Sequence, residues 1–221
     1  MSLINNDISY NPLYTYGVHE VIKRNNFRYY KIENLLVPSV TSILGVSRPN
    51  QDYNYSAKQA DSFEIGNMMH DYLDKYITNR NTCTESSKNS KIASDLSKVI
   101  INNIFPMVTS FIASEATVHD QYSYAGTLDL LAEIDDKLTI IDYKSSYRKK
   151  SSFLIDEHFQ QLAAYAIAHD NMHNTEIEQA KLFIVYKESY EFEILTANKS
   201  LLDDYKQMWQ DKLRYYNEVS A

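Results

Sequence analysis

The spacing of apolar residues predicts two helices in the first half of the chain. Over residues 56–77, apolar side chains recur at intervals of three and four, which is the spacing of one helix face. These positions are Ile65, Met69, Tyr72, Leu73 and Tyr76. A second helix is expected over 92–113, with Pro106 as a kink or a break. A turn is expected at 48–52, and the polar residues 79–91 indicate a surface loop between the helices.

The pattern then changes to the period of strands. Short runs rich in β-branched and aromatic residues predict three consecutive strands, and two further strands follow a helix. The expected strands are 116–124, 127–134, 138–143, 181–186 and 191–195, and the expected helices are 155–169 and 201–216. Elements in this order predict an α/β or α+β domain that is built on a central mixed sheet.

Residues 1–55 have a different character, because their pattern is irregular and they are rich in asparagine and tyrosine. Within them, 27–32 has the composition of a strand, and 38–44 predicts a short helix that is capped by Ser39. We therefore expect 1–55 to be an N-terminal extension of a main domain at 56–221, with the two packed as one compact unit.

The composition is that of a soluble globular protein. Of the 221 residues, 44% are hydrophobic and 23% are charged, which is enough apolar material for one domain with a sizeable core. The formal net charge of −7 argues against a protein that coats nucleic acid through bulk positive charge. Four glycines cannot build a glycine-rich phosphate loop, and a single cysteine, Cys83, excludes a disulfide framework and a thiolate zinc finger.

Two features of the sequence concern the compartment. The start of the chain has no basic region that leads into an apolar stretch, so no signal peptide is expected. Since no apolar run approaches the ~20 residues that span a bilayer, no membrane association is expected either. With one thiol and no export signal, a cytoplasmic location is the expectation.

The residues that suggest chemistry lie on two of the predicted strands, which are joined by a charged turn at Asp135 and Asp136. If these two residues form the hairpin loop, Asp129 lies directly opposite Asp142; if the turn shifts by one residue, Asp129 faces Lys144 instead. In either register the three side chains share one neighbourhood, because cross-strand Cβ atoms are about 4.5–5.5 Å apart. Asp142 and Lys144 point to the same face of their strand.

Two adjacent carboxylates repel each other unless a positive charge compensates them. Oxygen ligands suit Mg²⁺ or Mn²⁺, and a neighbouring lysine can position or deprotonate a water molecule. Asp129, Asp142 and Lys144 are therefore candidates for metal-assisted hydrolysis of a phosphodiester. The alternative is a surface strand on which aspartate and lysine simply alternate. The apolar run 138–141 before Asp142 favours the functional interpretation, since an unpaired buried charge is costly.

Four short motifs follow one another along the chain. They are Gly66-x-x-x-His70, Gly126-x-x-Asp129, Asp142-x-Lys144-Ser145 and Gln161-x-x-x-Tyr165. In this order they resemble the PD-(D/E)XK nuclease superfamily and, more narrowly, its RecB-like exonuclease branch. The segment 38–44 is also similar to a stretch of mitochondrial genome maintenance exonucleases and their phage relatives. The resemblance implies a restriction-endonuclease-like core, an α/β fold in which helices flank a central mixed sheet.

The resemblance also implies roles for the motif residues. His70, Asp129 and Asp142 would bind Mg²⁺ or Mn²⁺ together with the backbone carbonyl of Tyr143, and Lys144 would act on the attacking water. The residues that would hold DNA or support the lysine are Gln161, Tyr165, Ser145, Arg148, Lys149 and Lys150. An iron–sulfur cluster is excluded, because that subgroup of the branch needs four cysteines.

Several of these residues have plainer interpretations. Glu115 is a further candidate for a metal or water contact, but a solvated strand end is the alternative. Tyr165 suits the protein core as well as a site. Gly66 suggests the close approach of another backbone or of substrate, because glycine inside a helix costs about 1 kcal/mol relative to alanine. Gly126 suggests a bulge.

The expected function is that of a metal-dependent DNA exonuclease that prefers single-stranded ends. It would serve DNA replication, recombination or repair, or the DNA metabolism of a phage in its host's cytoplasm. One alternative is a double-strand exonuclease that works as an oligomeric ring, like the lambda type. Another is a nucleic-acid-binding module that has the same fold without catalysis; the intact Asp129, Asp142 and Lys144 argue against it.

Overall fold

The structure is a computed structural model and describes residues 9–24, 27–46, 57–80 and 86–220. The first eight residues and the turn expected at 48–52 lie outside this description. Within it, no helix combines the length and the apolar character that crossing a bilayer requires.

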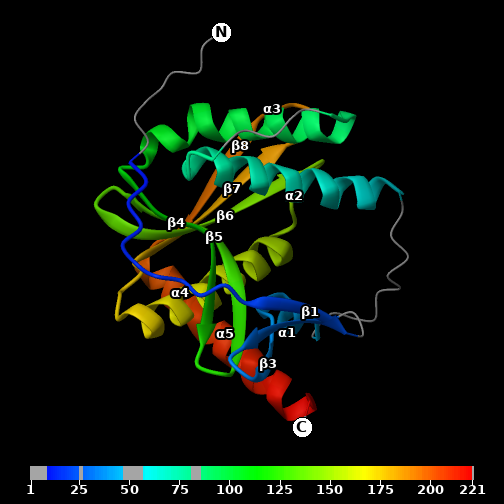
Figure 1. Ribbon diagram of the computed structural model, residues 1–221. Helices are drawn as coiled ribbons and strands as arrows, with labels where there is room; N and C mark the ends of the chain where they lie inside the picture. Colours follow the sequence, from blue (N-terminus) through cyan, green and yellow to red (C-terminus); the bar gives the residue numbers. More distant parts are fainter. Residues whose placement is uncertain (1–8, 25–26, 47–56, 81–85, 221) are drawn as a thin grey trace.

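A five-stranded mixed sheet forms the centre of the molecule (Figure 1). Its strands lie side by side in sequence order: β4 (Ser110–Asp120), β5 (Tyr124–Ile134), β6 (Lys137–Ser146), β7 (Gln179–Tyr186) and β8 (Phe192–Ala197). The pair β6 and β7 is parallel and the other neighbours are antiparallel. A parallel pair needs a crossover, which is the helix α4 (Ser152–His173). The expected α/β domain with a central mixed sheet is confirmed.

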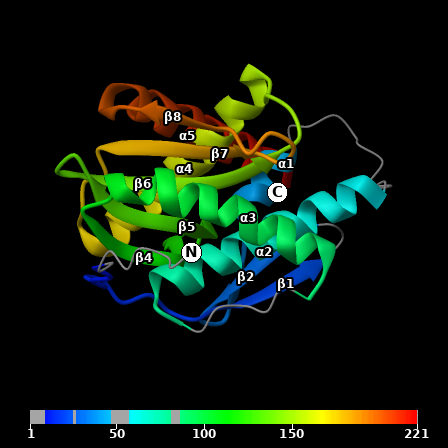
Figure 2. The ribbon, with the colours of Figure 1, turned by 90° about the horizontal axis from the view of Figure 1, so that it is seen from above.

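Helices cover both faces of this sheet (Figure 2). On one face lie α2 (Ala57–Ile77) and α3 (Lys88–Asn103). On the other lie α4 together with α1 (Val40–Val46) and α5 (Lys199–Ser220). The sheet therefore separates two apolar cores, as expected for a sheet that is sandwiched between helices.

The side chains of strand β7 alternate between the two apolar cores. Leu182 and Ile184 belong to the core beneath α4 and α5, whereas Phe183 and Val185 belong to the core beneath α2 and α3. Every residue of β7 is buried. A strand that is buried on both faces has a continuous apolar run instead of an alternating pattern. The apolar run within 181–186 was the basis on which this strand was predicted.

The hairpin between β5 and β6 has the first of the two registers considered above. Asp135 and Asp136 both have positive φ angles, 54° and 58°, as a tight two-residue hairpin loop requires. The paired residues run back from the turn to Leu130 and Ile141. Asp129 and Asp142 follow directly after this last pair, so the hairpin delivers both carboxylates to the place where the two strands separate.

A second, smaller sheet is formed near the N-terminus by β1 (Glu20–Arg24), β2 (Phe27–Ile32) and β3 (Leu35–Pro38). The predicted strand at 27–32 is confirmed and has two antiparallel partners. The expected helix follows as α1, and Ser39 caps it by accepting a hydrogen bond from the Ser42 N–H at 3.1 Å. The division into an extension at 1–55 and a domain at 56–221 stays a prediction.

The second predicted helix was wrong at both ends. The helix α3 spans Lys88–Asn103, a short 3₁₀ turn at Phe105–Met107 contains Pro106, and the chain is already in strand β4 at Ser110. Pro106 ends the helix because it cannot donate within it. At the start, Ser87 and Ser90 form a capping box, which makes a helix of residues that were expected in a polar loop.

Candidate metal and nucleic-acid site

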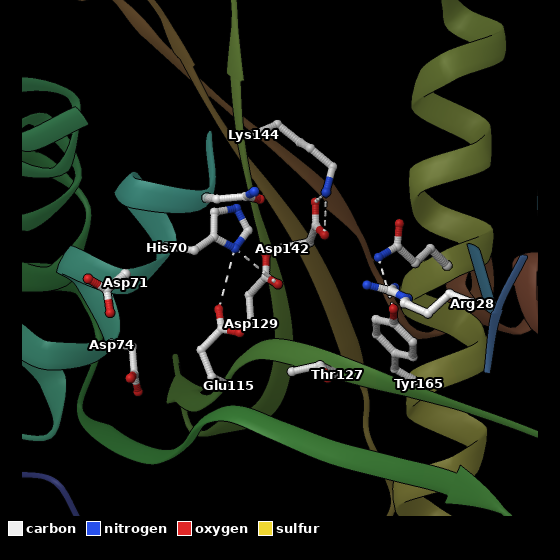
Figure 3. Close-up of a pocket in the computed structure, with 12 residues that line it drawn as sticks. Arg28, His70, Asp71, Asp74, Glu115, Thr127, Asp129, Asp142, Lys144 and Tyr165 are labelled. Atoms are coloured by element: carbon white, nitrogen blue, oxygen red, sulfur yellow. Dashed lines mark hydrogen bonds and ion pairs between the residues drawn. The ribbon is translucent and has the colours of Figure 1, made fainter. Parts of the chain in front are cut away.

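A cleft of about 410 Å³ opens where β5 and β6 separate, between α2 and α4 (Figure 3). It brings together most of the predicted site residues. Those that line it are His70, Glu115, Asp129, Asp142, Lys144, Gln161 and Tyr165. Residues predicted to act together thus come from two helices and three strands and meet in one place.

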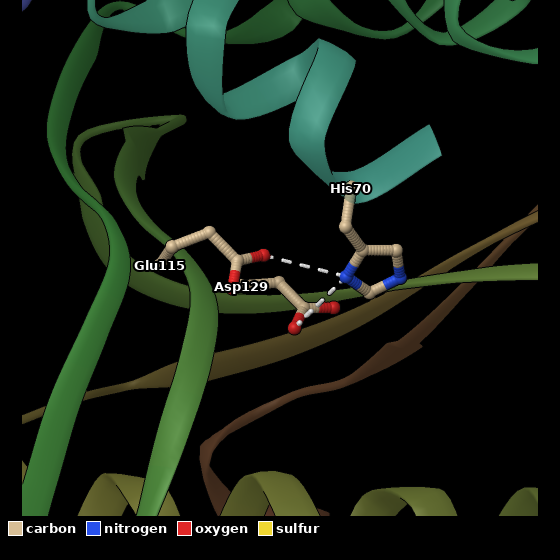
Figure 4. A group of neighbouring side chains, drawn as sticks. All are labelled: His70, Glu115 and Asp129. Carbon is tan, nitrogen blue, oxygen red and sulfur yellow. Dashed lines mark ion pairs between the residues drawn. The ribbon is translucent and has the colours of Figure 1, made fainter. Parts of the chain in front are cut away.

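His70, Glu115 and Asp129 form a compact group within the cleft (Figure 4). The Nδ1 atom of His70 lies 3.4 Å from a carboxylate oxygen of Glu115 and 3.4 Å from one of Asp129. One ligand atom from each residue lies within 4.8 Å of the others, which is the separation that a shared cation needs. An imidazole with two carboxylates suits a divalent metal ion, and the identity of that ion as Mg²⁺ or Mn²⁺ stays a prediction.

Glu115 enters this group through an unusual backbone. Its φ angle is +47°, in the left-handed region that a side chain with a Cβ seldom adopts. The pairing of β4 with β5 also shifts register between Phe111 and Ala113. Strained backbone of this kind tends to occur at functional sites. Glu115 lies in the middle of β4 and not at a strand end; it lines the cleft, and its side chain is 35% exposed.

The orientation of the His70 ring is set by a backbone group. Its Nε2–H donates to the Tyr143 carbonyl at 3.0 Å, which leaves Nδ1 to face the two carboxylates. A carbonyl partner of this kind fixes the tautomer of metal-binding histidines. Here the Tyr143 carbonyl, expected as a metal ligand, serves as this partner, and its role as a ligand stays a prediction.

Electrostatic interactions among His70, Glu115 and Asp129 shift the pKa values of these residues. Burial alone would lower the pKa of His70, but the charge of Asp129 and hydrogen bonds to Asp129 and Glu115 raise it to about 10. Burial would raise the pKa of Asp129, but His70, Lys144 and the Tyr143 N–H, which donates to it at 2.8 Å, hold that pKa below its ordinary value. The charges of His70, Glu115 and Asp129 are therefore electrostatically linked.

Asp142 and Lys144 form a buried ion pair beside this group. Asp142 is 1% exposed, and this burial raises its pKa to about 6, although the neighbouring ammonium opposes the shift. The pKa of Lys144 is raised, because the charges of Asp142 and Asp129 outweigh its burial. Near neutral pH both groups are ionised. Asp142 thus meets Lys144 directly and stands next to the three-residue group.

Gln161 and Tyr165 lie across the cleft on one face of α4. The Gln161 amide donates to the Tyr165 hydroxyl at 3.1 Å. Tyr165 is buried, so the core interpretation and the site interpretation both apply to it. The suggested bulge at Gly126 was wrong: this residue pairs regularly with Val118. At Gly66 an added Cβ would lie 3.7 Å from Ser145 Oγ, an ordinary contact.

The predicted basic segment after β6 lies outside the cleft lining. Arg148 is exposed, and its backbone carbonyl accepts a hydrogen bond from the Ser146 hydroxyl. Lys149 makes an exposed ion pair with Glu193 at 2.8 Å. Lys150 is partly buried and lies within the electrostatic reach of Lys144. Their role in DNA binding stays a prediction.

Sequence reasoning missed five residues of the cleft: Arg28, Asn67, Asp71, Asp74 and Thr127. Three of them share a face of α2 with His70 at helical spacing, and that spacing was a usable signal. Arg28 comes from β2 of the small sheet, where its guanidinium donates to Thr41 at 3.0 Å. Only the packing of the small sheet brings it to the cleft, so no local signal could have identified it.

Comparison with known proteins gives three consistent findings. The family model of the PD-(D/E)XK nuclease superfamily matches residues 88–219. Mitochondrial genome maintenance exonuclease 1 of Homo sapiens is 23% identical over 210 residues, which cover 85% of this chain and 60% of that protein. The Mus musculus protein of the same name is 23% identical over 205 residues, which cover 82% and 59%. The chain thus spans about 60% of the length of these relatives.

A likeness in fold accompanies the likeness in sequence. The crystal structure of an exonuclease candidate from Eubacterium rectale aligns with a TM-score of 0.52 and 12% identity, and the alignment covers 81% of each chain. At this identity the match shows the fold alone. The family match and the mixed sheet between helices confirm the expected core. His70 and Arg28 lie outside the matched residues 88–219.

Proposed function

Because the chain belongs to the PD-(D/E)XK nuclease superfamily, we propose that it is a metal-dependent exonuclease that hydrolyses DNA from single-stranded ends. The observation that carries the proposal is the meeting of His70, Glu115 and Asp129 beside the Asp142–Lys144 pair in one cleft. The curated relatives are named for exonuclease activity in mitochondrial genome maintenance, which supports a role in DNA replication, recombination or repair.

The proposed chemistry assigns a task to each group. His70, Glu115 and Asp129 would hold Mg²⁺ or Mn²⁺, with Asp142 beside them. When bound, such a cation supplies Lewis acidity at the phosphate and a more acidic water. Lys144, held by Asp142, donates a hydrogen bond to the attacking water or to a phosphate oxygen. Water adds to phosphorus, the bond to the 3′ oxygen breaks, and a proton passes to that oxygen, which leaves a 5′-phosphate and a 3′-hydroxyl.

The walls of the cleft would hold the strand. Gln161 and Tyr165 line the cleft from α4, and Arg28 lines it from the small sheet. The Arg28 Nε atom is buried and has no hydrogen-bond partner within the described chain. The terminal nitrogens of a guanidinium that lines the cleft are well suited to a phosphate oxygen. The cytoplasmic location stays a prediction.

The test is digestion of DNA that carries a label at either end. Single-stranded and double-stranded oligonucleotides are incubated with Mg²⁺, with Mn²⁺ or with a chelator, using the wild type, Lys144→Ala and Lys98→Ala. Lys98 is a surface lysine that pairs with Asp95 on α3. We expect metal-dependent release of terminal nucleotides, preferentially from single strands, by the wild type and Lys98→Ala. The enzyme proposal fails if the wild type releases no label; equal activity of Lys144→Ala overturns the site.

Preference for duplex ends, with a ring-sized oligomer in gel filtration, would favour the lambda-type alternative. Metal-independent DNA binding without cleavage would favour the binding module. The first outcome would contradict the proposed preference for single-stranded ends. The second would contradict the proposed nuclease activity.

A further inference from the structure

Two lysines outside the cleft lining lie at the same edge of the central sheet as the catalytic lysine. Because β6 and β7 are parallel, their carboxyl ends meet at one edge. Lys187 directly follows β7, and its backbone N–H donates to the Ser146 carbonyl at the end of β6 at 2.8 Å. Lys150 lies in the loop that continues from β6 toward α4. The edge that carries Lys144 therefore carries two further ammonium groups.

Lys187 is buried without an acidic partner. It is 5% exposed, and its Nζ donates to the Ser62 hydroxyl at 2.5 Å and to the Ser62 carbonyl at 3.2 Å. The same Nζ lies 4.9 Å from the centre of the Tyr147 ring. Throughout the described part of the chain, no carboxylate comes within ion-pair distance of it. A buried charge without a counter-charge is costly, so folds seldom keep one without a use.

Lys150 follows β6 by four residues and is partly buried near both Lys144 and Lys187. Burial and the charge of Lys144 lower the pKa of Lys150, while Asp142 acts in the opposite direction. Burial and the charge of Lys150 lower the pKa of Lys187 to about 8. The positive charge of Lys144 thus acts on Lys150, and that of Lys150 acts on Lys187. Among the described residues, the carboxylate whose charge acts on Lys150 is that of Asp142, which is already paired with Lys144.

We propose that Lys150 and Lys187 form a phosphate-binding track that leads away from Lys144 and holds the nucleic-acid backbone beside the scissile bond. This inference rests on the proposed function and adds a direction to it, along the carboxyl ends of β6 and β7. Phosphate oxygens are strong acceptors that supply the missing negative charge. Local positive charge of this kind allows a protein of net charge −7 to hold a polyanion.

A plain structural role is the competing explanation, because the bond from Lys187 to Ser62 ties α2 to β7. The matched control is Lys181 at the other end of β7, which is also buried and also donates to a hydroxyl, that of Thr196, at 3.1 Å. Because the two lysines are buried to a similar extent, removal of either charge is expected to perturb folding to a similar degree. A salt-dependent effect on DNA binding is expected for Lys187 and not for Lys181.

Binding is measured by fluorescence anisotropy with a labelled single-stranded oligonucleotide, in chelator so that no cleavage occurs, over a range of salt concentrations. For Lys187→Met and Lys150→Met we expect roughly tenfold weaker binding, the loss of one charge-assisted hydrogen bond. The slope of log affinity against log salt should fall by about 0.7 for each phosphate contact that is lost. Lys187→Arg should restore the slope, and Lys181→Met should match the wild type.

A substrate with one phosphate separates the track from the catalytic group. The nitrophenyl ester of thymidine 5′-phosphate has no neighbouring phosphate, so Lys187→Met should hydrolyse it with Mn²⁺ as fast as the wild type while its KM for an oligonucleotide rises. If the wild type neither binds single-stranded DNA nor hydrolyses the ester, the proposed function fails. If the wild type does both, and Lys187→Met keeps its affinity and salt slope, the track is overturned. Lys150→Met, at a more accessible position, gives the same test if Lys187→Met does not fold.

Discussion

The phenol ring of Tyr165 lies directly over Gly126, so closely that no side chain fits between them. A Cβ added to Gly126 would lie 2.2 Å from Cε1 of Tyr165 and 3.0 Å from its hydroxyl oxygen. The glycine of one motif therefore makes room for the tyrosine of another. This contact places α4 close to the strand that carries Asp129, and it holds Tyr165 and its partner Gln161 against the cleft.

Gly126→Ala should disturb this contact and the cleft with it. A buried methyl group that meets an aromatic ring must displace it, at a cost of about 1–3 kcal/mol. We expect the free energy of unfolding in urea to fall by that amount, and cleavage of end-labelled DNA to fall with it. The control is Gly45→Ala on α1, where an added Cβ meets no atom within 4 Å. A Gly126→Ala protein as stable and active as the wild type would show that Tyr165 is not held in this way.

Glu115→Gln should weaken metal binding. The substitution keeps the shape of the side chain and removes one of the two carboxylates that face His70 Nδ1. Since Mn²⁺ prefers anionic oxygen ligands, we expect its affinity, measured by isothermal titration calorimetry, to fall about tenfold or more. Glu64→Gln on the same helix as His70 is the control, because Glu64 bonds Asn89 instead of lining the cleft. Equal Mn²⁺ affinity in the two variants would show that Glu115 does not bind the metal.

Lys144→Met should destabilise the fold as well as abolish cleavage. It leaves the Asp142 carboxylate buried without its cation, and breaking a buried pair on one side costs about 3–5 kcal/mol. The double variant Asp142→Asn with Lys144→Met should regain much of this stability, because it leaves no unpaired charge. Urea unfolding in chelator measures both. A double variant no more stable than Lys144→Met would show that the two charges are not coupled.

Stability should fall in mild acid because of His169. This residue is fully buried, and its ring nitrogens bond the hydroxyls of Tyr16 and Thr175 at 2.8 and 2.9 Å. Burial, and next the charge of His173, lower its pKa from 6.5 to about 4. Between these values the unfolded chain takes up a proton that the folded chain does not. Stability is therefore full above pH 6.5 and falls as the pH drops toward 4, by on the order of 3 kcal/mol.

The measurement is the free energy of unfolding as a function of pH for the wild type, His169→Gln and His19→Gln. Glutamine can bond both hydroxyls and does not titrate, so the loss of stability between pH 6.5 and 4 should be smaller in His169→Gln. His19 is partly exposed and lies outside the buried core, so its variant should follow the wild type. Parallel curves for all three proteins would rule out this role of His169.

Much of the fold was determined by local sequence. The buried strands β5, β6 and β7 have apolar runs that show their type and order, and Asp135 with Asp136 shows where the hairpin turns. The register could not be chosen from the sequence, because Asp136 lies in the loop in either register. The left-handed backbone of Asp135 and Asp136 decided it. The helix α3 was misplaced because an apolar run at 111–113 looks the same in a helix as in a strand.

For the candidate site, the sequence determined the motif residues on α2, β5, β6 and α4, since each motif lies within one element whose period sets the direction of its side chains. The hairpin already predicted that Asp129, Asp142 and Lys144 lie close together, but tertiary structure decided which other groups join them. Glu115 joins His70 because the register shift in β4 and the left-handed backbone turn it toward the cleft. Arg28 reaches the cleft from β2, a segment distant in sequence from the motifs. Contacts of this kind depend on how helices and strands pack against one another, and a local sequence pattern does not specify that packing.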